Sequence, residues 1–210
     1  MTDETPAPHR IADAAALEAL YGTVKETSLR KEVDHVHPLY RKLIEASPFV
    51  VLATCGPGGM DASPRGDAPG FVLVHDERTL LLPDRRGNNR LDSLRNLLDD
   101  PRVALLFMVP GVGETLRVNG RAHISVAPEL LQRFIVNGNP PATVLVVQVD
   151  SVYFQCSKAL VRSHLWDAAA QIERRKLPSP GTLLAALTES AVDAEAYDRE
   201  LPARLQANLY

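Results

Sequence analysis

The sequence predicts a mainly β fold, an antiparallel β-barrel with flanking helices. Six or seven segments between residues 49 and 155 have strand character and are separated by turn signals such as the GPGG at 56–59. Several strands, including VALLFMV and TVLVVQV, are apolar on both faces, which suits a barrel wall covered by helices or by a partner chain. Helical patterns precede, interrupt and follow the strands.

The expected strands follow one another with short connections. FVVLATC is a buried strand, and MDASPRGD resumes the chain in extended form after the turn. GFVLVHD and RTLLLP form a hairpin that turns at 76–78. PRVALLFMV and ETLRVNGRAHISV are joined through PGVG, and TVLVVQVDSVYFQ is a long, curved strand.

Helices are expected at both ends of the chain and between strands. A first helix lies in 11–22 and stops at Gly22, and a second, 37–47, carries Pro38 in its first turn. Leu91 begins a further apolar periodicity, and Gly138 is interpreted as the C-cap of a helix in 128–138. The segment 157–175 is helical at least in part, and two amphipathic helices occupy 182–190 and 193–210.

Composition narrows the class of protein. The 210 residues carry a net charge of −3, so no overall basic field favours nucleic acid or an anionic membrane surface. Two cysteines do not form a disulfide framework and indicate reduced thiols. The opening MTDETPAPHR is unlike a secretory signal, and the apolar runs are too short to span a bilayer as helices. A cytoplasmic protein is expected.

The junction between the strand 78–83 and the next helix is rich in hydrogen-bond donors. We interpret Asn88 as the helix N-cap, which leaves the amides of Asn89 and Arg90 pointing outward at the positive end of the helix dipole. Arg90, with Arg85 or Arg86, adds full positive charge. This pattern indicates a phosphate site. The alternative is a capped surface helix with solvated arginines.

A second basic residue stands in the extended segment DASPRGD. Arg65 has the planar guanidinium that suits bidentate phosphate recognition, and the glycine after it permits close backbone approach. The alternative is an arginine at a strand end paired with a carboxylate. Three carboxylates are candidates: Asp61, Asp67 and Asp84.

Two further segments place polar side chains on one face. Strand alternation puts Thr115, Arg117 and Asn119 on the same side, which fits a strand that lines a site and equally an exposed strand. In SKALVRSHLW, Lys158 and Arg162 share a helix face.

Trp166 is expected to continue this stripe, which follows the small residues Cys156 and Ser157. The alternative is a solvated basic face with the indole tucked into the core. No metal site is expected, since His35 and His37 have no Cys, Asp or Glu cluster at ligand spacing. No acid/base pair stands out as catalytic.

Five segments in this order, SPRGD, LPDRRGNNRLDSLRNLL, DPRVALLF, ETLRVNGRA and CSKALVRSHLW, resemble the pyridoxamine 5′-phosphate oxidase-like superfamily of flavoproteins. The most similar branch contains FMN-dependent enzymes of undefined substrate. The resemblance implies an antiparallel split β-barrel of the FMN-binding type over 38–166, between helical extensions at 1–37 and 167–210. It also implies a homodimer with FMN in a cleft between the subunits.

The resemblance implies cofactor contacts residue by residue. Arg65 matches a residue that contacts the phosphate or ribityl chain, a strand end passes beside the isoalloxazine ring, and a polar triplet clasps the phosphate. Thr115 lies near the flavin, and a polar pair comes from the other subunit. The strand end is Leu82, Pro83 and Asp84, the triplet is Asn88, Asn89 and Arg90, and the pair is Cys156 and Ser157.

Two departures from the family pattern bear on the substrate. The usual Ser-Arg-Lys triplet is replaced by Asn-Asn-Arg, which lowers the number of cations. The tail YDRELPARLQANLY lacks the basic motif with which the authentic oxidase grips its substrate's phosphate. Pyridoxine chemistry is therefore not expected. Arg117, Lys158, Arg162 and Trp166 are assigned instead to a small, anionic substrate.

The functional hypothesis is an FMN-dependent oxidoreductase of unknown substrate. The alternative is a non-catalytic flavin or haem protein that acts in binding or storage. Within the superfamily the deazaflavin F420 is a further cofactor, and its longer acidic tail requires a basic groove that Arg85, Arg86 and Arg90 could begin.

Overall fold

A computed structural model describes residues 9–189 and 191–210. Two parts of the chain lie outside the described residues. They are residues 1–8, which belong to the segment unlike a secretory signal, and residue 190, the last residue of the helix expected over 182–190. The chain divides into two compact units, Met1–Glu32 and Val33–Tyr210. The described part of the first unit contains helices α1 (Ala14–Tyr21) and α2 (Glu26–Arg30). Asp13 caps α1 and Gly22 (φ 74°) ends it, as the sequence predicts.

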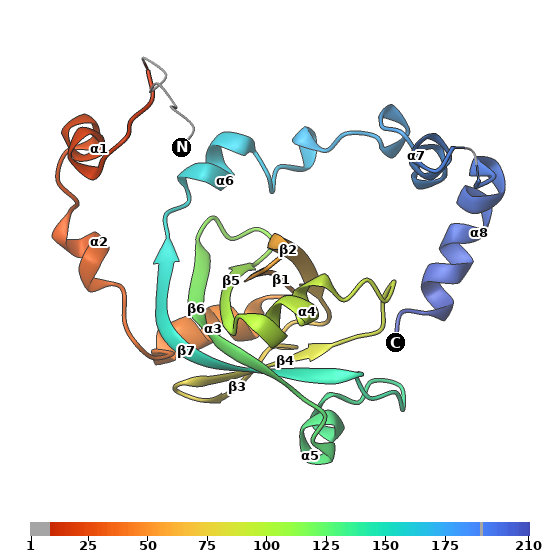
Figure 1. The fold of residues 1–210 in the computed structure, drawn as a ribbon, viewed down its shortest axis with the longest axis horizontal. Helices are drawn as coiled ribbons and strands as arrows, with labels where there is room; N and C mark the ends of the chain where they lie inside the picture. Colours follow the sequence, from red (N-terminus) through yellow and green to blue (C-terminus); the bar gives the residue numbers. More distant parts are fainter. Residues whose placement is uncertain (1–8, 190) are drawn as a thin grey trace, which may run out of the picture. The chain divides into compact units, whose positions relative to one another are not determined.

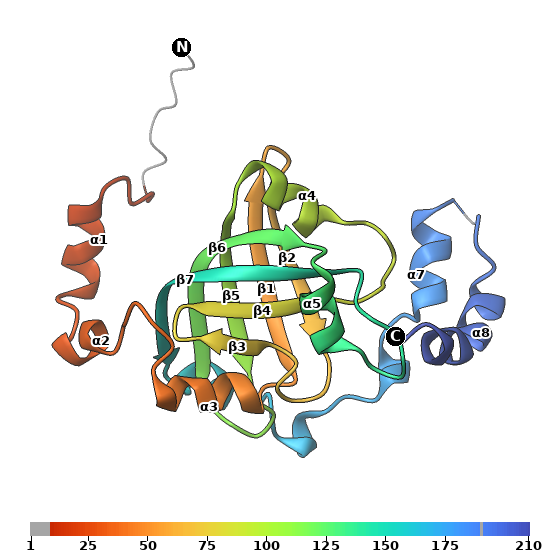
Figure 2. The same ribbon diagram turned by 90° about the horizontal axis from the view of Figure 1, so that it is seen from below.

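The second unit is built on one antiparallel sheet with the strand order β2-β1-β5-β6-β7-β4-β3 (Figures 1 and 2). The sheet curves around its core, but its edge strands, β2 and β3, are not paired with each other, so the barrel is split, as predicted. The strands are β1 (Phe49–Gly56), β2 (Gly59–Gly66), β3 (Leu73–Asp76), β4 (Thr79–Asp84), β5 (Arg102–Met108), β6 (Thr115–Ser125) and β7 (Thr143–Gln155).

The long strands bend where their register shifts. The β6–β7 ladder shifts by one residue between Asn119 and Gly120. A Cβ atom on Gly120 would lie 2.2 Å from the carbonyl oxygen of Gln148, so glycine allows the two backbones to approach at the bend. The predicted hairpin of β3 and β4 is also confirmed.

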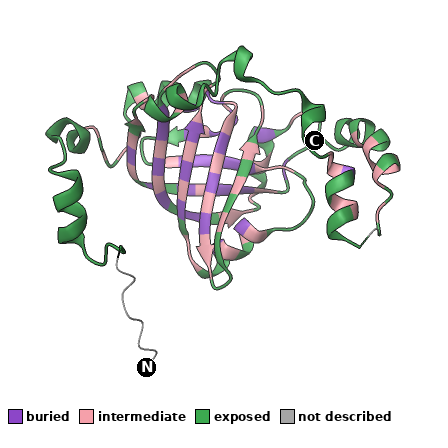
Figure 3. Cartoon of the chain, turned by 90° about the horizontal axis from the view of Figure 1, so that it is seen from above, coloured by how far each residue is buried: buried purple, intermediate pink, exposed green. Residues whose placement is uncertain are grey.

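Alternation along the strands separates the core from the outer surface (Figure 3). Fully buried side chains such as Leu52 of β1 and Phe107 of β5 fill the barrel. Helices α3 (Pro38–Ala46) and α4 (Asp92–Asp99) add Ile44 and Leu97 to the same core. The side chains between these core positions face away from it and are half-buried.

The helix predicted over 128–138 is shorter than expected. It consists of α5 (Pro128–Leu131) and a 3₁₀ turn, η1 (Gln132–Phe134). Gly138 is not its C-cap. With Asn137 it makes a turn with positive φ angles, 51° and 81°, between the bridged residues Val136 and Asn139. The Asn-Gly pair forms a hairpin-like turn, in which glycine adopts the positive φ that it would also adopt at a helix C-cap.

The segment after β7 begins with α6 (Lys158–Ser163), which ends at His164 in the left-handed region (φ 52°). Trp166 therefore does not continue the helix, and the predicted stripe is wrong at that point. Its indole Nε1 donates to the carbonyl oxygen of Val112 at 2.8 Å. Two 3₁₀ turns follow, η2 (Ala168–Ala170) and η3 (Arg174–Lys176), and then helices α7 (Pro180–Leu187) and α8 (Ala194–Ala207). Within residues 9–189 and 191–210, no helix is long and apolar enough to cross a membrane.

Candidate functional site

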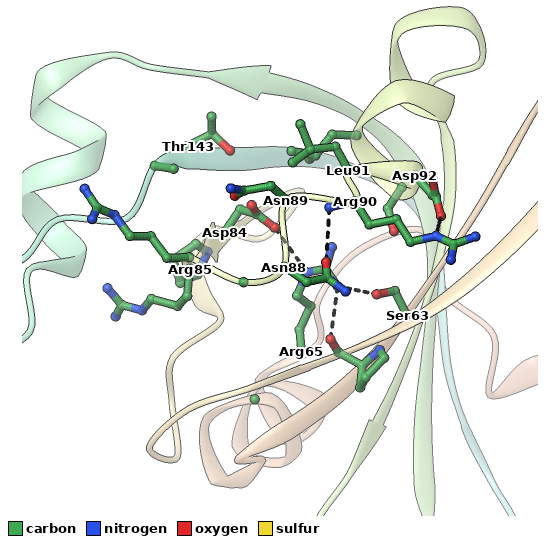
Figure 4. A pocket seen from close by; sticks show the side chains of 18 of the residues that line it. Ser63, Arg65, Asp84, Arg85, Asn88, Asn89, Arg90, Leu91, Asp92 and Thr143 are labelled. Carbon is green, nitrogen blue, oxygen red and sulfur yellow. Dashed lines mark hydrogen bonds and ion pairs between the residues drawn. The ribbon is translucent and has the colours of Figure 1, made fainter. Parts of the chain in front are cut away.

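A cavity of about 660 Å³ lies where β2, the end of β4, the loop 85–91 and the start of α4 meet (Figure 4). Its volume is in the range typical of small-molecule sites. β2 is one edge of the sheet and β4 lies next to the other edge, so the cavity sits at the split of the barrel. Six of the residues matched to cofactor positions line it: Arg65, Pro83, Asp84, Asn88, Asn89 and Arg90.

The other matched residues lie elsewhere in the chain. Leu82 is fully buried in the core and lies outside the cavity lining. Thr115 begins β6 opposite Gln155, the last residue of β7, and Cys156 and Ser157 follow directly. One chain therefore presents two separate groups of matched residues, one at the split and one at the β6–β7 end.

Asn88 does not cap α4. Its side-chain oxygen accepts from the backbone amide of Arg90 at 3.1 Å and closes a turn upstream of the helix. The N-cap is Leu91, which has a left-handed backbone (φ 60°) and makes no side-chain cap with any described residue. Asn89 is also left-handed (φ 59°). Asparagine tolerates this conformation, but it is costly for leucine, and such strained residues concentrate at functional sites.

Two carboxylates lie at the positive end of α4. Ser93 of the first turn donates its hydroxyl proton to Asp61 of β2 at 2.5 Å. Asp92 accepts from Nε of Arg90. The helix dipole is thus partly satisfied by the protein's own side chains. The sequence predicts outward-pointing amides at Asn89 and Arg90, but the Arg90 amide instead donates to the side chain of Asn88.

Arg65 and Asp84 form an ion pair across the split of the barrel. Nε of Arg65 lies 3.2 Å from Oδ1 of Asp84, and the side chains are only 19% and 13% exposed. Nη1 of Arg65 donates to Ser63 Oγ at 2.6 Å and to the Pro64 carbonyl at 3.0 Å. Burial raises the pKa of Asp84 above its ordinary value, although Arg65 opposes this effect. Of the three candidate carboxylates, the structure selects Asp84.

A second buried pair fixes Arg85 at the rim of the cavity. Its Nε lies 2.9 Å from Oδ2 of Asp67, and its Nη1 donates to the Phe134 carbonyl at 2.6 Å. The hydroxyl of Tyr210 donates to Asp67 at 2.7 Å, and its ring centroid lies 5.3 Å from the guanidinium carbon. Burial acts to raise the pKa of Asp67, but the hydrogen bonds from Tyr210, the Ala68 amide and Arg85 outweigh it and lower that pKa. Tyr210 is not predicted at this site from the sequence, because it lies 143 residues from Asp67.

The wall contributed by β7 holds an unsatisfied polar atom. Oγ1 of Thr143 is buried and has no hydrogen-bond partner among the described residues. Thr143 stands opposite Asp84 in the β4–β7 ladder and lines the cavity. A ligand that supplied a partner would remove this cost.

The donor set and the space suit a ligand with an anionic end and a planar apolar part. Arginines and asparagines line one part of the cavity, and Phe71, Pro83 and Leu94 supply apolar surface. Three of the guanidinium groups are paired with carboxylates, but the pairs leave the cavity open. A flavin mononucleotide fits these residues in kind and in size.

The residues assigned to substrate lie away from this cavity. Nη1 of Arg117 donates to the hydroxyl of Tyr153 at 2.8 Å, and its guanidinium lies over that ring. Lys158 and Arg162 are exposed on α6. Thr115, at the start of the same strand, is buried with a relative exposure of 6%, whereas Arg117 is half-buried.

The sequence model of the pyridoxamine 5′-phosphate oxidase family matches residues 36–156. The chain belongs to this family. The match contains every cavity residue and confirms the resemblance seen in the sequence. It ends before Lys158, Arg162 and Trp166. No curated protein sequence matches the chain.

Several solved structures resemble the oxidase-family chain. Group A Streptococcus HupZ is 16% identical, with 55% of this chain and 90% of HupZ covered and a TM-score of 0.46. An F420 reductase is 23% identical (53% and 94% covered, TM-score 0.40). A pyridoxinephosphate oxidase family protein from Clostridium acetobutylicum, related to general stress protein 26, is 16% identical (55% and 84% covered, TM-score 0.42).

Proposed function

We propose that the protein binds FMN in the cavity at the split of the barrel and acts as an FMN-dependent oxidoreductase on a small molecule. The observation that carries the proposal is the gathering of six family-matched positions around one cavity of flavin size. Bound FMN would supply the redox chemistry by accepting a hydride or electrons from the substrate and passing them to an acceptor.

The chain's own residues would bind and orient the cofactor. Arg65 is held by Asp84, Ser63 and the backbone, so its remaining N–H groups are fixed in direction before a ligand arrives. Pro83 and Phe71 would exclude water from one side of the ring. The hydroxyl of Thr143 would gain a partner that the protein alone does not give it.

A second copy of the chain is part of the proposal. Cys156 and Ser157 match positions near the flavin but lie outside the cavity of their own chain, which a homodimer explains. The outer face of β1 and β5 is apolar and half-buried, with Val51 opposite Leu106 in the ladder. This face is the candidate interface. A dimer formed there would cover apolar surface that one chain leaves in water.

The cofactor is tested by denaturing the purified protein and identifying the released small molecule by mass spectrometry, alongside its visible spectrum. FMN supports the proposal, whereas F420 or haem would replace FMN by another cofactor. Anaerobic reduction by NADH, NADPH or a screened metabolite would then separate an enzyme from a flavin-binding protein. A colourless protein that takes up no added FMN contradicts the proposal.

The dimer is tested by replacing Leu106 with arginine and measuring mass by light scattering. We expect a monomer that retains its fold and loses FMN. The matched control is Met60→Arg, at a side chain that is 85% exposed on the β1–β2 hairpin, which should remain dimeric. A wild-type monomer that binds FMN with full occupancy would remove the second copy from the proposal.

A further inference from the structure

Helices α7 and α8 lie side by side and form a hairpin that is held together by its own residues (Figure 2). The backbone amide of Gly181 in α7 donates to Oδ1 of Asp198 in α8 at 2.8 Å. A Cβ atom on Gly181 would lie 2.3 Å from the carbonyl oxygen of Ala194, so the two helices touch at this glycine. None of the residues 194–207, all of them described, is buried. The place of the α7–α8 hairpin on the barrel therefore depends on the segments at its ends.

Tyr210, which follows α8, joins this hairpin to the rim of the cavity. Its hydroxyl donates to Oδ1 of Asp67 at 2.7 Å, and its ring centroid lies 5.3 Å from the guanidinium carbon of Arg85. Asp67 and Arg85 are themselves a buried pair, with side-chain exposures of 5% and 16%. The hydrogen bond to Asp67, together with burial, raises the pKa of Tyr210 and keeps the phenol in its donating form.

Arg85 stands between two hollows. It lines the cavity at the split of the barrel, and it also lines a smaller pocket of about 210 Å³ beside Phe134. A side chain with a hollow on either side gains less from packing, so its position depends on the groups that contact its guanidinium. These groups are the Asp67 carboxylate, the Phe134 carbonyl and the Tyr210 ring, which come from three distant parts of the chain.

We propose that Tyr210 is a positioning residue, which latches the α7–α8 hairpin onto the Asp67–Arg85 pair and so fixes the wall that Arg85 gives the cavity. Tyr210 does not line the cavity itself, so its effect on a ligand passes through Arg85. Such coupling is reciprocal, so a ligand that holds Arg85 in place also holds the hairpin more firmly. The coupling rests on the proposed FMN site, whereas the latch is a property of the protein without a ligand.

The latch is tested on apoprotein by amide hydrogen exchange. We expect Tyr210→Ala to speed exchange in α8 about fivefold or more, because a hairpin released from the barrel loses contacts that oppose its local unfolding. Tyr210→Phe keeps the ring beside Arg85 and should give a smaller increase. Exchange in α8 that is the same in wild type and in Tyr210→Ala would overturn the latch, whether or not the protein binds FMN.

The coupling is tested by fluorescence titration with FMN and by exchange in its presence. Tyr210→Ala should weaken FMN binding about fivefold, and FMN should slow exchange in α8 of the wild type but not of Tyr210→Ala. In an Arg85→Gln background, Tyr210→Ala should change the FMN affinity less than about 1.5-fold, because its effect passes through Arg85. A general loss of stability would instead lower the affinity equally in both backgrounds.

The matched control is Tyr197→Ala, which removes a tyrosine ring from α8 that lies 4.2 Å from the guanidinium carbon of Arg204 in the same helix. It should leave the FMN affinity within about 1.5-fold of wild type and keep the protection of α8 by FMN. Wild-type protein that binds FMN without a change in α8, and equally well after Tyr210→Ala, overturns the coupling and leaves the proposed function standing. Wild-type protein that takes up no FMN overturns the proposed function and the coupling together, while the exchange comparison on apoprotein still decides the latch.

Discussion

Replacing Arg65 by alanine removes one partner of a mostly buried ion pair and leaves the other without compensation. Asp84 is 13% exposed, and the only cation bonded to it among the described residues is Arg65. Because the pair connects β2 with β4 across the split of the barrel, its loss acts on the closure of the fold as well as on the carboxylate.

The magnitude follows from the exposure of the two side chains. Breaking a fully buried pair by removing one partner costs roughly 3–5 kcal/mol, whereas an exposed pair contributes about 0–1 kcal/mol. With exposures of 19% and 13%, the Arg65–Asp84 pair is closer to the buried limit. We expect Arg65→Ala to lose about 2–3 kcal/mol of unfolding free energy at neutral pH. Asp84→Asn should cost less, about 1 kcal/mol, because Arg65 keeps Ser63 and Pro64 as acceptors.

The pH dependence of stability follows from the raised pKa of Asp84. Burial raises the pKa of Asp84 in the folded protein above its unfolded value, so the folded state binds the proton more tightly. This contribution to stability is present in full below the unfolded pKa, 3.8, and is lost as pH rises through the folded pKa. Without Arg65 the folded pKa rises further. The unfolding free energy that Arg65→Ala loses relative to wild type should therefore grow between pH 4 and pH 7.

Urea unfolding of apoprotein at several pH values measures these quantities, with the m-value as a check that the denatured state is unchanged. The double variant Arg65→Ala with Asp84→Asn should be more stable than Arg65→Ala alone, because no charge is left buried. A loss below about 0.5 kcal/mol at pH 7, or a double variant less stable than the single, would refute the reasoning, since either would mean that Asp84 is solvated after Arg65 is removed.

Three further predictions concern the loop, the tail and the bend of the sheet. Tyr210→Phe removes the hydroxyl that donates to Asp67 and should raise the pKa of that carboxyl and lower stability by about 1 kcal/mol above the unfolded pKa, a loss that fades as pH falls, measured by urea unfolding. Leu91→Asn places a residue that tolerates φ 60° at a 46% exposed site and should stabilise the apoprotein by about 0.5–1 kcal/mol, measured by thermal unfolding. Gly120→Ala puts a Cβ 2.2 Å from the Gln148 carbonyl and should destabilise by about 2 kcal/mol or more, with faster amide exchange in β6 and β7.

The strands were predictable because their signals are local. Alternation and turn residues mark β1 to β7, and consecutive strands pair in β1–β2, β3–β4, β5–β6 and β6–β7. The start of α4 was not predictable to the residue. An asparagine before a helix can cap it or can close a turn upstream, and both uses draw on the same side-chain oxygen. In this chain Asn88 closes the turn, and Leu91 takes the cap position in a conformation that its residue type does not indicate.

The ion pairs could not be predicted for a different reason. Arg65 had three acidic candidates, and two of them, Asp61 and Asp67, are close to it in sequence. The actual partner, Asp84, lies on β4, and four other strands lie between β4 and β2 in the order of the sheet. Only the curvature of the whole sheet brings these two strands together, and no periodicity within either strand records it. Tyr210 and Asp67 also meet only in the folded chain, because Tyr210 follows α8 and is 143 residues away in sequence.

The ion pairs change how the arginine-rich junction between β4 and α4 is interpreted. Counting cations in the sequence suggests a strongly positive site, and the departure from the family triplet then reads as a loss of one charge. In the folded chain three of the four cavity arginines are balanced by carboxylates. The number of arginines in the loop therefore overstates its free positive charge, because the fold balances most of them with carboxylates.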